Sequence, residues 1–244
     1  WEFIRFITVV FSRFFRQLSR GQFRFHDTVL QVYSVGVLSL PVVAFSLAFI
    51  ALMMILEFSF HMKQVLRQDS LVPAFSTLLM LRELGPVVTC LLLTSRVGAG
   101  ISAEIGTMRV TDQLDAMLLL SLDPIDYLVL PRWVACVLAC IFLSVVSVAI
   151  AIVAGASIAS VKLGYTVPEF FNTMFVFARL KDGTACLVKS AVFGTLLPLV
   201  ASFHGLRCKP GSEGVGSAAT NAVVHGSILI IIADFVVTYV LYTL

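Results

Sequence analysis

The segment LLMLRELGPVVT, residues 78–89, places two adjacent charged residues, Arg82 and Glu83, near the middle of an otherwise uncharged run from Leu71 to Ser95. That run is long enough to cross a bilayer, because about 20 apolar residues in a helix span a hydrocarbon core of roughly 30 Å. A charge at the bilayer centre costs on the order of 2.5–3.5 kcal/mol on insertion scales. The pair therefore needs partners on other helices, and these must be sought among the charged residues elsewhere in the chain.

The composition indicates that lipid is the main solvent of this chain. Of its 244 residues, 59% are hydrophobic and only 13% are charged, and the mean hydropathy is +1.00. A soluble domain of this size needs more polar surface than that. We therefore predict an all-α integral membrane protein with about five transmembrane helices, at approximately 29–56, 71–98, 133–161, 187–206 and 219–244. The first stretch contains Pro41, and the sequence leaves open whether it is kinked or re-entrant.

The first 25 residues have a different pattern, typical of an amphipathic helix that lies in the head-group layer. Apolar residues recur at helical spacing and arginines fall mainly on the opposite side. The apolar set is Phe3, Phe6, Ile7, Val10, Phe11, Phe14, Phe15 and Leu18, and the basic set is Arg5, Arg13, Arg16 and Arg20. We divide the chain into this interfacial helix, residues 1–25, and a single transmembrane domain, residues 26–244.

The distribution of lysine and arginine predicts the orientation. With the N-terminus in the cytoplasm, ten basic residues fall inside and six outside, which agrees with the positive-inside rule. The longest polar connection, residues 104–132, then lies in the cytoplasm. Thr107 to Leu120 has the composition of a helix lying across that face, and Asp123-Pro124 resembles the start of a new helix. The alternative is a plain solvated loop.

The partners that we predict for the charged pair are Asp182 and Lys189, which lie on one face if a single helix contains both. Arg82 and Glu83 point about 100° apart on a helix, so they neutralise each other poorly. We pair Glu83 with Lys189 and Arg82 with Asp182. Such a cluster either fixes the register of two helices or takes part in transport.

Other chemical signals are weak. The five cysteines have no paired spacing and are expected to be packing residues, and we predict no metal site. The glycine-rich stretch at 210–222 lacks the Lys-Ser/Thr of a P-loop, and the small net charge of +3 does not suggest nucleic acid. No nucleophile and base stand together, so no catalytic residue is predicted.

Several long motifs together resemble the MlaE/YrbE permease family: LRELGPVV, SRVGAGISAEIGTMRVTDQLDAM, SLDPIDYLVLPR, GSEGVGSAATNAVV and ADFVVTYVLY. The resemblance implies the permease subunit of an ABC transporter in the bacterial inner membrane, which moves phospholipids between that membrane and a periplasmic carrier. It implies a homodimer that works with a cytoplasmic ABC ATPase and an MCE-domain protein, often with a STAS-domain subunit. ATP and Mg²⁺ would bind to the ATPase, so this chain would need no cofactor of its own.

The resemblance also implies residue roles. The stretch from Glu104 to Met117 matches the coupling helix that docks on the ATPase, with Glu104, Gly106, Thr107, Met108, Arg109, Thr111, Asp112, Gln113 and Asp115 as contact candidates. Arg82, Glu83, Asp182 and Lys189 match charged positions of the family's membrane domain. Candidates for the lining of a lipid cavity between two protomers are Ile55, Leu56, Met62, Leu66 and Leu84.

Two other functions compete with this interpretation. An ion-coupled secondary transporter would use Glu83 and Lys189 as a proton relay, but no two-fold internal repeat is visible. An intramembrane lipid-modifying enzyme would need catalytic groups at one membrane depth, and the sequence offers no such set.

Overall fold

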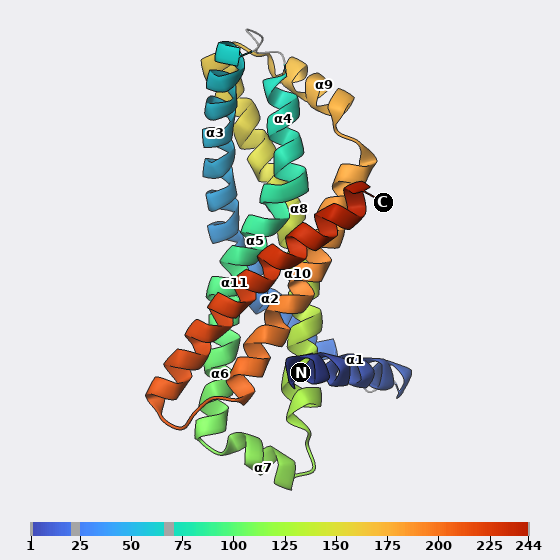
Figure 1. Ribbon diagram of the computed structural model, residues 1–244, viewed down its shortest axis with the longest axis vertical. Helices are drawn as coiled ribbons and strands as arrows, with labels where there is room; N and C mark the ends of the chain where they lie inside the picture. Colours follow the sequence, from blue (N-terminus) through green and yellow to red (C-terminus); the bar gives the residue numbers. More distant parts are fainter. Residues whose placement is uncertain (1, 21–24, 66–70, 244) are drawn as a thin grey trace.

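The computed structural model describes residues 2–20, 25–65 and 71–243, and every regular element in these ranges is helical. Five helical runs are long and apolar enough to cross a membrane, and a further helix precedes them, as predicted. The spans are Phe25–Met62, Val72–Val110, Ile125–Leu163, Leu180–Leu206 and Ser212–Leu241. They form an elongated bundle with α7 at one end and α9 at the other (Figure 1). We call these the α7 end and the α9 end.

The second span extends beyond its predicted end, because apolar patterning detects only the lipid-embedded part of a helix. It consists of α4 (Val72–Leu79), η2 (Met80–Leu84), α5 (Gly85–Leu93), η3 (Thr94–Gly98) and α6 (Ala99–Val110). The helix predicted over Thr107 to Leu120 is therefore not one piece. Its first part ends span 2, and Asp112 then adopts a left-handed conformation with φ of 57° before the short α7 (Gln113–Leu119) begins. Asp is one of the few residues that tolerate that conformation.

Prolines explain two widened turns within spans. In η2 the Gly85 N–H donates to the Met80 carbonyl, five residues back, and Pro86 follows. The same pattern occurs in η4 (Ile125–Val129), where the Leu130 N–H donates to the Ile125 carbonyl before Pro131. Proline has no N–H to donate and its ring crowds the carbonyl four residues back, so a π-type turn relieves the conflict. The break that the sequence predicts at Gly85-Pro86 takes this form, and the span continues through it.

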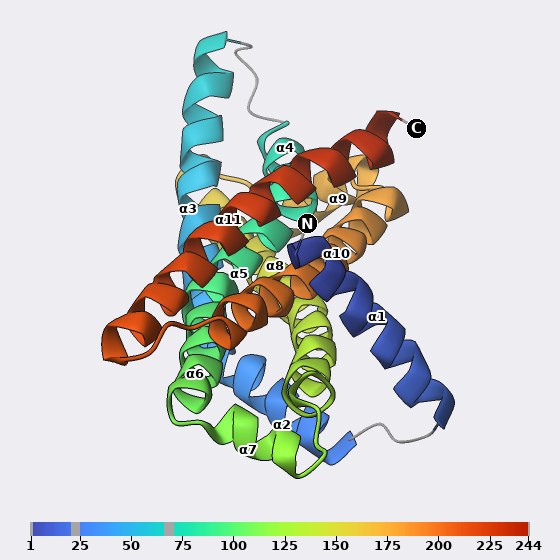
Figure 2. The same cartoon turned by 60° about the horizontal axis from the view of Figure 1, so that its bottom comes forward.

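The first span resolves the ambiguity at Pro41. It consists of α2 (Phe25–Val35), a 3-10 turn η1 (Val37–Ser39) and α3 (Leu40–Val65). The chain does not turn back at η1, because α3 carries on toward the α9 end in both views (Figures 1 and 2). The segment is thus an interrupted span rather than a re-entrant hairpin.

The core of the bundle is formed by α8 (Leu130–Leu163) and α10 (Leu180–Leu206), which are joined through α9 (Val167–Phe177). α8 and α10 pack closely where Gly194 faces α8: an added Cβ there would lie 2.9 Å from Cys140 Cβ and 3.0 Å from Val137 Cα. Small residues permit such contacts between membrane helices. Four cysteines are buried and all five are free thiols, in agreement with a packing role.

The N-terminal helix α1 (Glu2–Arg20) uses its aromatic face to dock on the bundle. Phe11 and Phe14 contact the Trp133 ring, with centroids 5.1 Å and 4.9 Å away, and Phe3 contacts Phe203 at 5.2 Å. The helix lies across the long axis of the bundle (Figure 1). This arrangement is the one expected of a helix in the head-group layer. Residue 25 as the boundary between two units stays a prediction.

Candidate functional site: a buried charge cluster

Three spans contribute to a cluster of charged side chains. Arg82 and Glu83 lie on η2, Asp182 and Lys189 lie on α10, and Asp234 lies on α11 (Ser212–Thr243). The η2 turn that presents the first two is the widened one before Pro86. π-type turns of this kind are frequent at functional sites.

Both contacts that the sequence analysis paired are present. The Nε atom of Arg82 donates to Oδ1 of Asp182 at 2.6 Å, and Nζ of Lys189 donates to Oε2 of Glu83 at 2.6 Å. Each pair joins span 2 to span 4. The role of the cluster, in contrast, stays a prediction.

The sequence analysis missed the third acid. Lys189 Nζ also lies 2.8 Å from Oδ1 of Asp234, so one ammonium group serves two carboxylates. Thr238, four residues further along α11, approaches Glu83 Oε1 at 3.5 Å. A signal was available, because Asp234 is the only Asp, Glu, Lys or Arg between Gly214 and the end of the chain.

Burial is uneven within the cluster. The side chains of Lys189 and Asp182 are 0% and 1% exposed, whereas those of Asp234, Glu83 and Arg82 are 22%, 31% and 36% exposed. Asp182 also caps the start of α10, because the Arg179 backbone N–H donates to its Oδ2 at 2.9 Å. The Arg82–Asp182 pair therefore lies toward the α9 end. Because the helix of span 2 continues to Val110, Arg82 and Glu83 lie nearer to one end of that helix than to its middle, and their depth in the bilayer stays a prediction.

This arrangement can connect spans without adding much net stability. A buried ion pair gains little over an apolar pair, yet removing one partner leaves an uncompensated charge and costs several kcal/mol. Lys189 depends most on its partners, since its positive charge is buried between two acids on different spans. The cluster therefore opposes any sliding of spans 2 and 5 against span 4 that separates these groups.

The predicted coupling residues form a corner between two helices. Glu104, Gly106, Thr107, Met108 and Arg109 lie on α6, Thr111 and Asp112 form the break, and Gln113 and Asp115 lie on α7. An Arg109 Nη1 to Asp115 Oδ1 bond of 2.8 Å closes the corner. Most of these residues are exposed, but Gly106 is buried against Cys208, so it is a packing residue in this structure.

Exposed leucines at this corner were not singled out from the sequence. The side chains of Leu118, Leu119 and Leu120 are 56%, 88% and 73% exposed, and Leu122 follows at 40%. Their pattern could have been noticed, because four leucines in a segment assigned to water need a partner surface.

The predicted lipid-cavity residues are distributed over different surroundings. Ile55 is buried against a cluster that includes Phe170, and Met62 packs at the edge of the same cluster. Leu84 packs near Met80, and Leu56 is 45% exposed. Leu66 lies outside the described residues. Ile55 and Leu84 therefore pack in two different clusters of the single chain, and a role between two protomers stays a prediction.

Metal chemistry has no visible support in the described ranges. No group of three His, Cys, Asp or Glu side chains there is placed to hold a metal ion.

Comparisons with known proteins agree with the helical architecture and the motifs. Residues 28–240 match the family model described as Permease MlaE. A probable ABC transporter permease protein of Rickettsia typhi is 36% identical over 212 residues, covering 87% of this chain and 82% of that protein. Probable ABC transporter permeases of a Synechocystis strain and of Pyropia yezoensis are 34% and 31% identical, covering 93% and 96% of this chain and 86% and 88% of those proteins. This multi-pass membrane chain therefore belongs to the MlaE family of ABC transporter permeases.

Proposed function

We propose that this chain is the permease subunit of a transporter that moves phospholipids between a bacterial inner membrane and a periplasmic MCE-domain carrier. A separate cytoplasmic ATPase would bind ATP and Mg²⁺, and this chain would contribute no catalytic residue. The match to the MlaE family over residues 28–240 carries the proposal. In the proposed orientation the N-terminus and the α7 end face the cytoplasm.

The α6–α7 corner is the proposed contact with the ATPase. It combines exposed charges, such as Asp112 and Asp115, with the exposed leucines 118–120. Apolar side chains at the rim of a polar surface favour a protein partner. A helix is stiff along its axis, and the helix of span 2 runs from this corner back to Arg82 and Glu83. Movement of the ATPase at the corner would therefore reach the charge cluster through span 2.

A homodimer is proposed because one face of α11 is poorly covered. Ile228, Ile231, Phe235 and Tyr239 are between 49% and 73% exposed and follow helical spacing. A second copy could cover part of this face and leave an apolar space between the protomers. Such a space, open to lipid on its sides, suits a phospholipid better than an aqueous pore does. Spans 1, 2 and 5 are its proposed walls.

The test of the coupling surface is reversal of its charge. With Asp112→Arg plus Asp115→Arg, we expect loss of copurifying ATPase and of lipid-stimulated ATP hydrolysis, because like charges would meet at the contact. Glu169→Arg, an exposed acid on α9 at the opposite end, is the matched control and should change neither. Unchanged assembly and hydrolysis in the double variant would remove the corner from the coupling interface.

The substrate and energy source require a transport assay. The complex reconstituted in liposomes should move a labelled phospholipid only when ATP is present. Transport that needs no ATP and stops when the proton gradient is dissipated would instead support the ion-coupled alternative with Glu83 and Lys189 as relay.

A further inference from the structure

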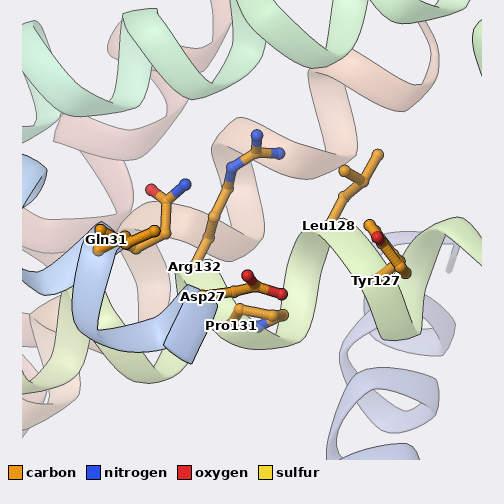
Figure 3. A pocket seen from close by; sticks show the side chains of 7 residues that line it. Asp27, Gln31, Tyr127, Leu128, Pro131 and Arg132 are labelled. Carbon is orange, nitrogen blue, oxygen red and sulfur yellow. The ribbon is translucent and has the colours of Figure 1, made fainter. Parts of the chain in front are cut away.

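A second polar site lies at the α7 end, away from the charge cluster. It is a pocket of about 210 Å³ between the beginning of α2 and the beginning of span 3 (Figure 3). Its lining residues are Asp27, Leu30, Gln31, Tyr127, Leu128, Pro131 and Arg132. None of these residues belongs to the cluster or to the predicted coupling set.

Arg132 is the residue that points to a ligand. It is only 4% exposed, and its Nη2 donates to Oε1 of Glu104 at 2.6 Å. Its Nη1 is buried and has no hydrogen-bond partner among the described residues. A buried donor on a charged group is costly to leave unpaired, so an acceptor from outside the chain is expected there.

The chemistry of the site favours a phosphate. A guanidinium group presents its N–H donors in a fork that matches phosphate oxygens, and Arg132 has one arm of that fork unused. The amide of Gln31 lines the same pocket and can donate as well; the two side chains extend in the same direction in Figure 3. Asp123 and Asp126 face Arg13, and Glu104 accepts from Nη2 of Arg132 rather than from Nη1.

The position of the pocket favours a lipid as the source of that phosphate. α2 and η4 begin spans 1 and 3, and η4 contacts α1, the helix expected in the head-group layer. Leu30, at the pocket, is 56% exposed, and Tyr33 and Val37 continue an exposed strip along span 1 at 57% and 47%. An acyl chain can follow this strip while its head group reaches Arg132.

We propose that this pocket binds the phosphate head group of a glycerophospholipid from the leaflet at the α7 end, with Arg132 as the principal contact. Asp27 also lines the pocket, so a zwitterionic head group with an amine beside its phosphate meets less repulsion than a plain anion. Phosphatidylethanolamine is therefore expected to bind more tightly than phosphatidylglycerol. The inference is independent of the proposed transport function, because a lipid bound here need not be a transported one.

The experiment measures lipid binding to the delipidated complex by native mass spectrometry, with dioleoyl phosphatidylethanolamine as the probe. Arg132→Gln should weaken one binding event about tenfold, the ratio expected for loss of one hydrogen bond to a charged group. Lys181→Gln is the matched control: it removes an exposed cation at the start of α10, outside the pocket lining, and binding should persist. Gln31→Leu should cause a smaller loss of lipid binding, and it replaces Arg132→Gln as the test variant if Arg132→Gln does not fold.

Competing ligands distinguish the sources of the phosphate. Dioleoylglycerol has the same chains without phosphate and should not compete, and glycerophosphoethanolamine or inorganic phosphate should compete only weakly. Equal binding by the wild type, Arg132→Gln and Gln31→Leu would overturn the proposal, as would full competition by dioleoylglycerol. Inorganic phosphate that competes as well as the lipid would indicate a soluble ligand. Loss of the ATPase subunit from Arg132→Gln with unchanged lipid binding would assign Arg132 to a protein contact instead.

Discussion

Acid–base pairs occur in two settings in this protein, inside the bundle and on the α7 end. Inside, Lys189 is fully buried between Glu83 and Asp234 on two other spans. On the α7 end, Arg109 and Asp115 are 43% and 53% exposed, and Arg13 faces Asp123 with both side chains partly exposed. Water and salt screen the second set, whereas the fully buried ammonium group of Lys189 depends on the two carboxylates beside it. The same residue types therefore constrain helix positions in one region and contribute little in the other.

The largest expected effect comes from removing the shared cation. Lys189→Met leaves Glu83 and Asp234 facing each other without a counter-charge, so we expect a loss of about 3–5 kcal/mol of stability. Thermal unfolding in lipid nanodiscs measures it. Lys181→Met, an exposed lysine on the same helix, is the control and should leave the midpoint unchanged. Equal midpoints for both variants would mean that the cluster is not the electrostatic unit described above.

Exchanging the charges tests the pairing itself. Glu83→Lys places two ammonium groups together and should abolish lipid transport, while adding Lys189→Glu should restore part of it. Full recovery is not expected, because the new carboxylate at position 189 would have a different length and Asp234 would remain beside it. Transport assays on Glu83→Lys, Lys189→Glu and the double variant give the interaction energy between positions 83 and 189. Absence of any rescue would contradict a functional role for this contact.

A surface pair should behave in the opposite way. Arg13→Gln removes the contacts of Arg13 with Asp123 and Asp126, and we expect a loss below about 1 kcal/mol that decreases as salt is added. Thermal unfolding at low and high salt checks this, with Arg5→Gln on the same helix as the control. A large loss of stability that does not depend on salt would mean that the contacts of Arg13 behave like those of the buried cluster.

Sequence patterns were sufficient where two charged residues together contrast with an apolar run or share a helical spacing. Arg82 and Glu83 stand out in an apolar run, and the spacing of Asp182 and Lys189 identified their partners. Asp234 contrasts equally with its span but has no neighbouring charge, and it was overlooked. The end of span 2 and the break at Asp112 were not predicted, because α6 continues the span with polar residues and the helix-forming composition runs on from Thr107 through Asp112 into α7. The Arg132 pocket depends on two helix beginnings that only tertiary packing brings together.

The smallest expected effect concerns the exposed pair of Glu2 and Arg207, which joins α1 to the end of α10. The hydrogen bond from Arg207 and its positive charge lower the pKa of the Glu2 carboxyl. A carboxylate with a lowered pKa contributes its attraction above the ordinary pKa and loses it as the pH falls through the lowered value. Glu2→Gln should therefore increase hydrogen exchange at the start of α1 slightly at neutral pH. It should make no difference at a pH where Glu2 of the wild type is already protonated. Because the pair is screened by water, the unfolding midpoint should not move, in contrast to Lys189→Met; a shift of similar size would mean that exposure does not separate the two regions.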